Sequence, residues 1–172
     1  FGEVAQRWSE IIKPRIEDTT FANYRKVMNK HVLPAFGNTP IADITSLDIE
    51  TFISKLKVGS KTKLNILTPF RLVIKFGKKH GIIHSNPFAD VDPIKSSKSR
   101  PAGVLSLDEI RCFVEVLDDF WKPLFILLFF TGVRIGEAAG LKWKRVDLVN
   151  SVVQIRKTIV YVSGTYVYKK PK

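Results

Sequence analysis

The chain has 172 residues, enough for one large domain or two small ones, and its 45% hydrophobic content excludes a disordered tail. No apolar run is long enough to span a membrane, and a single cysteine, Cys112, excludes internal disulfides and most zinc sites and suits a reducing cytoplasm. The net charge of +12 favours a nucleic-acid partner, although a ribosomal or membrane-surface protein fits the same total.

The positive charge is unevenly distributed. Residues 1–93 carry a net charge of +5, residues 94–101 carry +3 and residues 151–172 carry +5, whereas residues 102–150 carry −1. The flanks are therefore candidates for contact with a polyanion, and the central segment is nearly neutral.

Apolar residues at helical spacing predict four amphipathic helices in the first half. The first stops near Pro14 and faces the core with Phe1, Val4, Ala5, Trp8, Ile11 and Ile12. The second is capped by Thr19 or Thr20 and ends before Pro34. Its inward-facing residues are Tyr24, Val27, Met28 and His31.

The third predicted helix is capped by Thr45 or Ser46 and turns inward Ile49, Phe52, Ile53 and Leu56. The fourth begins at Ser60 or Thr62 and ends at Gly81, and its buried stripe is Ile66, Leu67, Phe70, Val73 and Ile74. Pro69 lies inside this helix and is expected to bend it.

The polar faces of the second and fourth helices carry basic side chains without interleaved acids. On the fourth helix these positions are Lys61, Thr68, Arg71, Lys75, Lys78 and Lys79, and on the second they are Asn23, Lys26 and Lys30. A solvated surface would explain any one of these lysines. For a whole stripe we favour contact with phosphates.

Residues 93–103 are rich in Pro, Ser and Gly and predict an interdomain linker. Its basic residues, Lys95, Lys98 and Arg100, either follow a nucleic-acid backbone or only keep the linker soluble.

The second half begins with a predicted capping box, Ser106 to Glu109. The inward stripe of the following helix is Leu107, Ile110, Phe113, Val114 and Leu117. The next helix, about Lys122 to Phe130, is almost wholly apolar and is expected to be buried. A strand from Val152 to Val162, a turn at Ser163-Gly164 and a strand from Thr165 to Lys169 then predict a hairpin.

One arginine, Arg134, stands between the apolar helix and a short second helix, after the glycine turn at Gly132. Glu137, three residues on, is on the same helical face and is expected to orient the guanidinium. A braced arginine beside a helix N-terminus suits a phosphate. The alternative is an Arg134–Glu137 ion pair that only caps the turn.

The segment around Arg134 resembles the first arginine box of the tyrosine recombinases, the phage integrases and their relatives. The matching positions are Thr131, Gly132, Val133, Arg134, Glu137, Leu141, Trp143 and Asp147. The resemblance implies a mainly α chain. Residues 1–92 would be a four-helix, SAM-like core-binding domain whose second and fourth helices contact DNA. Residues 93–103 would be a linker, and residues 104–172 the start of an α+β catalytic domain with a β-hairpin.

The resemblance also implies roles. Arg134 would hold the scissile phosphate, Glu137 would support it, and Lys172 would protonate the leaving oxygen, with Lys169 and Lys170 as rivals for that role. The family's His-x-x-Arg box and tyrosine nucleophile match nothing in this sequence, so the chain would be an inactive, C-terminally truncated fragment. Neither a nucleotide nor a metal would be needed, since the bond energy is kept in the phosphotyrosine link.

The function expected from these features is site-specific recombination of duplex DNA in the cytoplasm of a bacterial or phage-infected cell. The site would be of the inverted-repeat type, and the full-length protein would self-associate on it without a membrane. Two alternatives remain open: a non-catalytic DNA-binding accessory protein and a basic, structural RNA-binding protein.

Overall fold

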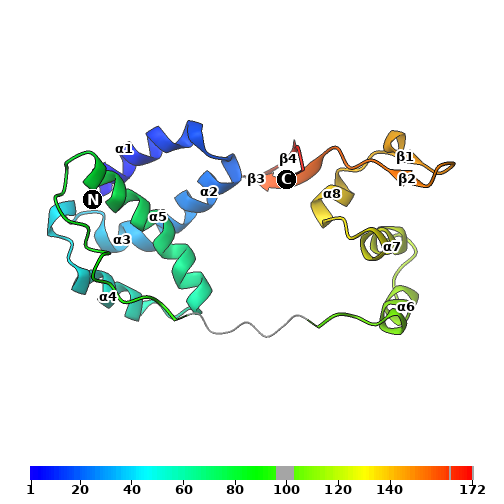
Figure 1. Cartoon of the computed structure of the whole chain (residues 1–172), viewed down its shortest axis with the longest axis horizontal. Helices are drawn as coiled ribbons and strands as arrows, with labels where there is room; N and C mark the ends of the chain where they lie inside the picture. Colours follow the sequence, from blue (N-terminus) through cyan, green and yellow to red (C-terminus); the bar gives the residue numbers. More distant parts are fainter. Residues whose placement is uncertain (96–102, 163, 172) are drawn as a thin grey trace. The chain divides into compact units, whose positions relative to one another are not determined.

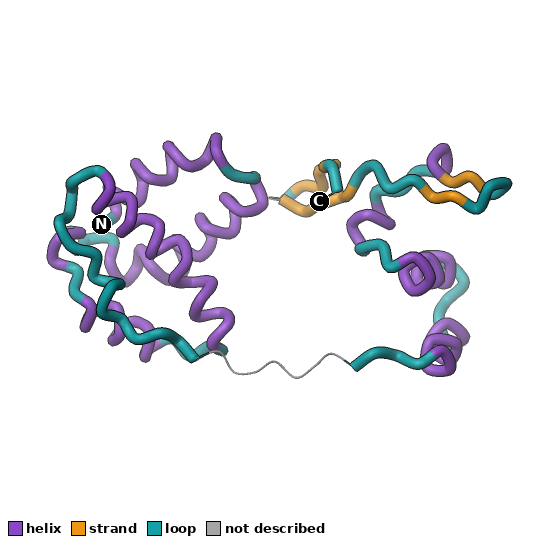
Figure 2. The backbone as a smooth tube through the Cα atoms, viewed as in Figure 1, coloured by secondary structure: helices purple, strands orange, loops and turns teal. Residues whose placement is uncertain are grey.

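The structure, a computed structural model, describes residues 1–95, 103–162 and 164–171 (Figure 1). The chain divides into two compact units, Phe1–Ser99 and Arg100–Lys172. The described part of the first unit contains helices and no strands, whereas the second combines three α-helices with two small antiparallel sheets (Figure 2). The chain is therefore mainly α, as the sequence predicts. No helix in these described segments has both the length and the apolar character to cross a membrane.

Five α-helices form the first unit. They are α1 (Gly2–Ile12), α2 (Asp18–Val27), α3 (Leu33–Phe36), α4 (Ser46–Lys55) and α5 (Ser60–Lys79). A π-helical turn, Met28–Val32, joins α2 to α3. Thr45 caps α4 through a capping box with Asp48, and Gly81, with φ of +69°, follows the end of α5. The start predicted for the third helix, which is α4, and the end predicted for the fourth, which is α5, are confirmed.

The core of the first unit is built around Phe70. Its ring is fully buried, and the rings of Phe1, Phe36 and Phe88 lie with their centroids 4.9 to 5.1 Å from it. The whole predicted stripe of α5 is at most 2% exposed. Its opposite face is thereby held toward solvent by a rigid core.

Three predictions for the first unit are wrong. The second helix begins at Asp18, with Glu17 as its N-cap, so neither Thr19 nor Thr20 caps it. The helical path also continues past Pro34, because the π-helical turn precedes it and Pro34 occupies the first turn of α3, where no amide donor is needed. Ile11 is 42% exposed, since it lies at the edge of the buried stripe of α1.

The second unit contains α6 (Leu107–Glu115), α7 (Lys122–Thr131) and α8 (Ile135–Ala139). Strand β1 (Val146–Asp147) pairs with β2 (Val152–Val153), and β3 (Thr158–Val162) pairs with β4 (Thr165–Lys169), both antiparallel. The hairpin and the capping box of Ser106 with Glu109 are confirmed. The predicted strand from Val152 to Val162 is wrong in one respect. It is two strands in different sheets, because residues 152–153 pair with β1 whereas residues 158–162 pair with β4.

The apolar helices of the second unit are less covered than predicted. No residue of α7 is buried, and Phe130 is 74% exposed. Leu107 and Phe113, predicted to point inward from α6, are exposed as well. The reason is geometric: α6 and α7 cover one another along one line of rings, where Phe113 meets Phe125 at 5.2 Å, and leave their other faces open.

Candidate functional site

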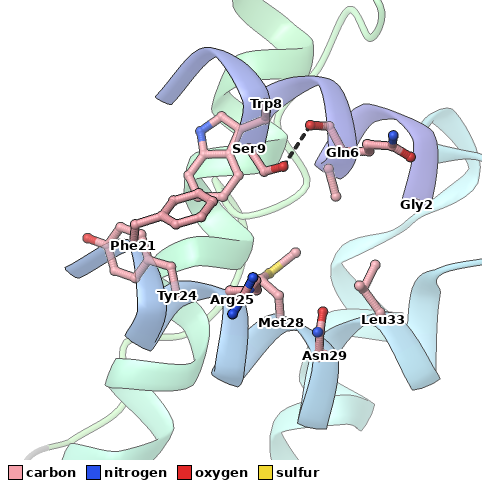
Figure 3. A pocket seen from close by; sticks show the side chains of 11 residues that line it. Gly2, Gln6, Trp8, Ser9, Phe21, Tyr24, Arg25, Met28, Asn29 and Leu33 are labelled. Atoms are coloured by element: carbon pink, nitrogen blue, oxygen red, sulfur yellow. Dashed lines mark hydrogen bonds between the residues drawn. The ribbon is translucent and has the colours of Figure 1, made fainter. Parts of the chain in front are cut away.

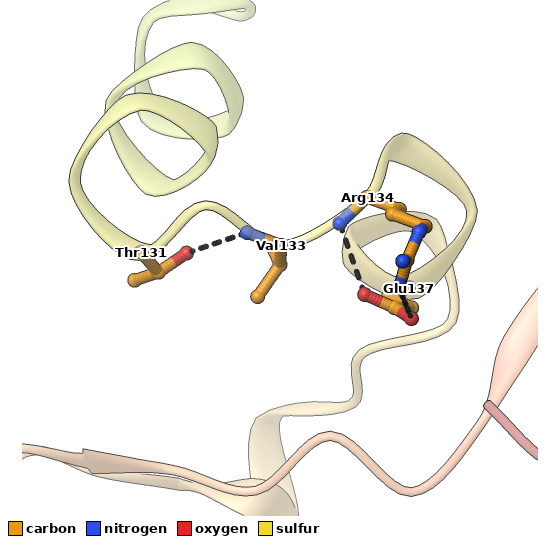
Figure 4. A network of polar contacts seen from close by, with 4 residues as sticks. All are labelled: Thr131, Val133, Arg134 and Glu137. Atoms are coloured by element: carbon orange, nitrogen blue, oxygen red, sulfur yellow. Dashed lines mark hydrogen bonds and ion pairs between the residues drawn. The ribbon is translucent and has the colours of Figure 1, made fainter. Parts of the chain in front are cut away.

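The turn that carries Arg134 is set by a left-handed glycine. Gly132 ends α7 with φ of +66°, a conformation that other residues rarely adopt. The Thr131 Oγ1 accepts a hydrogen bond of 3.4 Å from the Val133 amide (Figure 4). The chain then re-enters a helix with Arg134 as the N-cap of α8. The predicted order of apolar helix, glycine turn, arginine and short helix is confirmed.

Glu137 holds Arg134 at two points (Figure 4). Its Oε2 accepts from the Arg134 backbone amide at 3.0 Å, and its Oε1 accepts from Arg134 Nη1 at 3.2 Å. In a complete capping box the N-cap side chain also accepts a hydrogen bond from a backbone amide. A guanidinium has no acceptor, so only the half made by the Glu137 carboxylate is present. The predicted pairing of Glu137 with the guanidinium is therefore present.

The two partners differ sharply in exposure. The Arg134 side chain is 77% exposed, whereas that of Glu137 is 12% exposed. The hydrogen bond from the Arg134 amide, followed by the guanidinium, lowers the pKa of the Glu137 carboxyl against the opposing effect of its desolvation. The carboxylate stays ionised at neutral pH and fixes one edge of the guanidinium. The remaining donors face solvent and can bind an anionic oxygen.

The expected general acid, Lys172, lies outside the described residues. Its rivals lie at the end of β4, where Lys169 is half-buried and Lys170 is exposed. No hydrogen bond or ion pair found in the described segments joins either of them to Arg134.

The described positions of the first unit predicted to contact DNA are all exposed. Those on α5 are Lys61, Thr68, Arg71, Lys75, Lys78 and Lys79, here called the α5 stripe, and those on α2 and the π-helical turn are Asn23, Lys26 and Lys30. Lys95 is exposed at the end of the first described segment, whereas Lys98 and Arg100 lie outside the described residues.

One contact of the α5 stripe was not predicted. The Arg71 Cζ lies 5.1 Å from the centroid of the Phe88 ring, and that ring packs edge-on against Phe70. The arginine is thus braced by the core beneath it. No periodicity links residues this far apart, and a conspicuous aromatic residue after the Asn86-Pro87 turn was the one available signal.

A second unpredicted feature is a hollow of about 430 Å³ between α1 and α2 (Figure 3). Its walls include Trp8 and Tyr24, whose ring centroids lie 6.1 Å apart, and its polar lining includes Arg25 and Asn29. The hollow lies between α1 on one side and α2 with the following π-helical turn, which carry Lys26 and Lys30, on the other.

The sequence and fold were compared with those of known proteins. Residues 1–57 match the family described as phage integrase, N-terminal SAM-like domain. Over its whole length the chain is 26% identical to an integrase assigned to prophage phiRv2 of Mycobacterium tuberculosis, covering 46% of that protein. It is 28% identical over 155 residues to the tyrosine recombinase XerD of Corynebacterium glutamicum, covering 79% of this chain and 51% of that one.

The fold resembles two integrases solved with DNA. One is the Tn1549 transposon integrase with circular intermediate DNA, at a TM-score of 0.79 and 20% identity, covering 98% of this chain and 57% of the other. The other is a lambda integrase tetramer bound to a Holliday junction, at a TM-score of 0.71 and 22% identity, covering 98% and 49%. At these identities the likeness shows the fold.

These observations define a class of protein. It has an N-terminal SAM-like helical unit, followed by the start of a recombinase catalytic domain. The chain is similar to the phage integrases, or tyrosine recombinases, in sequence and in fold. It spans about half the length of the curated relatives it matches.

Proposed function

We propose that this chain forms part of a site-specific DNA recombinase that breaks and rejoins strands through a phosphotyrosine link. Residues 1–92 act as the core-binding domain, residues 93–103 as a basic linker and residues 104–172 as the beginning of the catalytic domain. The names of the relatives support this activity. Because the chain spans about half their length, the tyrosine and the rest of the phosphate clamp belong to a longer protein.

The observation that carries the proposal is the state of Arg134, which is exposed yet held by a nearly buried carboxylate. Strand cleavage moves negative charge onto the oxygens of the scissile phosphate, and a fixed guanidinium meets that charge without reorganising. The 77% exposure of its side chain leaves the guanidinium accessible to an anionic oxygen. In this proposal Lys172 donates a proton to the departing oxygen.

Duplex DNA is the proposed partner. The α5 stripe and the basic residues of α2 place cations on exposed helical faces, with Arg71 stacked on Phe88. Inverted-repeat sites and self-association on DNA are proposed because one structural relative is a tetramer on a Holliday junction. The setting is the cytoplasm of a bacterial or phage-infected cell, in accord with the prophage relative.

A titration of this chain on duplex DNA at several salt concentrations tests the proposal. Affinity is expected to fall steeply as salt rises, because bound phosphates release counterions. Arg71→Ala with Lys75→Ala is expected to reduce the slope of log affinity against log salt by about 2, roughly one per phosphate contact. Arg7→Ala with Lys13→Ala removes the same charge from another exposed face and serves as the control.

Two outcomes would contradict the proposal. A flat salt response would remove the phosphate contacts on which it depends. Tighter binding to RNA of the same sequence than to the duplex would favour the alternative of an RNA-binding protein.

The chain alone is proposed to be inactive in cleavage. Tyr161 and Tyr166 pair across the hairpin with ring centroids 5.1 Å apart, Tyr168 follows on β4, and Tyr24 packs in the first unit. None corresponds to the family nucleophile. A nicked duplex that traps phosphotyrosine links is expected to give no covalent adduct. An adduct lost on changing one of these tyrosines to Phe would show that the nucleophile lies here.

A further inference from the structure

The second unit contains a cationic hollow that the sequence did not predict. This hollow, here called the cation pocket, has a volume of about 230 Å³. The cations that line it are Lys142, Lys144, Arg145, Arg156 and Lys157. Lys142, Lys144 and Arg145 lie in the segment 102–150, whose net charge of −1 gave no reason to expect a basic surface, whereas Arg156 and Lys157 belong to the basic segment 151–172. The fold brings together cations that precede β1 and cations that follow β2, more than ten residues apart in the chain.

Two glycines make this convergence possible, Gly136 within α8 and Gly140 at its C-cap. A Cβ on Gly140 would lie 2.7 Å from the Lys157 carbonyl oxygen, and a Cβ on Gly136 would lie 2.7 Å from the Ile159 carbonyl oxygen. Such separations are too short for any other residue, so the absence of both side chains lets the backbone before β3 lie against α8. Arg156 and Lys157 are thereby held beside the segment that follows α8.

Three of the five cations contact neighbours that carry no negative charge. The Nζ atoms of Lys142 and Lys157 lie 5.4 and 5.5 Å from the centroid of the same ring, that of Tyr168. Arg145 donates from Nη1 to Gln154 Oε1 at 3.2 Å, and its carbonyl accepts from the Gln154 amide at 3.0 Å. An aromatic face and an amide oxygen orient these groups but leave their charge uncompensated.

No acidic residue lines the pocket, and none of the ion pairs within the described segments involves its five cations. Asp147, the nearest acid in sequence, instead accepts hydrogen bonds from Asn150. Five like charges around one hollow repel one another, and an anionic ligand with several oxygens would relieve that repulsion. All five cations are exposed, so a backbone phosphate can reach them.

We propose that the cation pocket is a second phosphate-binding site, which grips the backbone of duplex DNA from the second unit, separately from Arg134. Tyr168 acts as the positioning residue for Lys142 and Lys157. This inference rests on the proposed function, which supplies duplex DNA as the ligand, but the site itself is defined by its own residues.

The test is a salt titration of the whole chain on mixed-sequence duplex DNA. Lys142→Gln with Lys157→Gln is expected to weaken binding by about tenfold at low salt and to reduce the log–log salt slope by about 2. Arg111→Gln with Lys122→Gln removes the same charge from α6 and α7 of the same unit, where each cation already has an acidic partner. This control is expected to retain nearly the full slope.

A second pair of variants tests the positioning role without changing charge. Tyr168→Leu is expected to weaken binding by about threefold, a change of the size that one exposed cation–π contact supports. Tyr168→Phe retains the aromatic face and is expected to bind like the unaltered chain. Equal binding by both variants would overturn the role of Tyr168.

The outcomes separate this site from the proposed function. If the pocket variant matches its control while Arg71→Ala with Lys75→Ala still weakens binding, the cation pocket is refuted and the proposed function stands. If the unaltered chain shows no salt-dependent duplex binding, both fail. If the pocket variant loses affinity for single-stranded RNA alone, the site binds RNA and the assignment to duplex DNA is overturned.

Discussion

Glu137 binds Arg134 through both the backbone amide and the guanidinium, at 3.0 and 3.2 Å. One carboxylate therefore caps the first turn of α8 and orients the side chain proposed to grip the scissile phosphate. Since the same bonds serve folding and function, changes at Glu137 should alter stability and activity together.

The Glu137 carboxyl should make the stability of α8 depend on pH. Its pKa in the fold is lowered from about 4.5, so its contribution is present above that value and is lost as the pH falls through the folded pKa. Glu137→Gln removes this contribution. The stability difference between the two proteins should be largest near neutral pH and shrink in acid, as measured by hydrogen exchange of the α8 amides. Glu115→Gln, an exposed carboxylate on α6, is the control, and a difference that stays constant with pH would argue against the mechanism.

Gly140 should tolerate no side chain. A Cβ there would lie 2.7 Å from the Lys157 carbonyl oxygen and 3.0 Å from its carbon, and both are backbone atoms that cannot turn aside. Gly140→Ala is expected to destabilise the second unit by about 1–3 kcal/mol, as overpacking does elsewhere. Chemical denaturation would measure the loss. Gly103→Ala is the matched change, because no atom lies within 4 Å of its added Cβ, and an equal effect of both would refute the close approach.

Phe88 should influence DNA binding although its ring is nearly buried. It supports the Arg71 guanidinium at 5.1 Å, so Phe88→Leu is expected to lower duplex affinity by about two- to fivefold through a looser arginine. Phe76→Leu changes a half-buried ring on α5, the helix that carries Arg71, where it packs on His80, and should leave affinity unchanged. If Phe88→Leu has no effect once Arg71 is already changed to Ala, the two residues act through one another. Additive losses would contradict that coupling.

The sequence predicted the first unit better than the second for a physical reason. The apolar residues of α5 recur at helical spacing and are buried within their own unit, so their spacing predicts the fold directly. In α7 the apolar residues have no period that selects a face, and the prediction of burial was wrong at Phe130. The π-helical turn Met28–Val32 was missed because propensity does not distinguish it from an α-helix.

The candidate site was predicted where the relevant residues are close in sequence. Arg134 and Glu137 are one helical turn apart, so their pairing followed from spacing alone. Arg71 with Phe88 and Lys142 with Lys157 depend on tertiary approach, the latter through Gly140, and no local pattern encodes them.

Strand cleavage by the proposed full-length recombinase carrying Arg134→Ala tests the central claim most directly. Cleavage of a nicked duplex is expected to fall by about 10³-fold while duplex binding stays nearly unchanged, because the guanidinium is needed where charge builds up on the phosphate. Arg134→Lys should also cleave poorly, since an ammonium lacks the planar fork, whereas Arg111→Ala should cleave normally. Near-normal cleavage by a folded Arg134→Ala protein would contradict the assignment of Arg134 as the catalytic arginine.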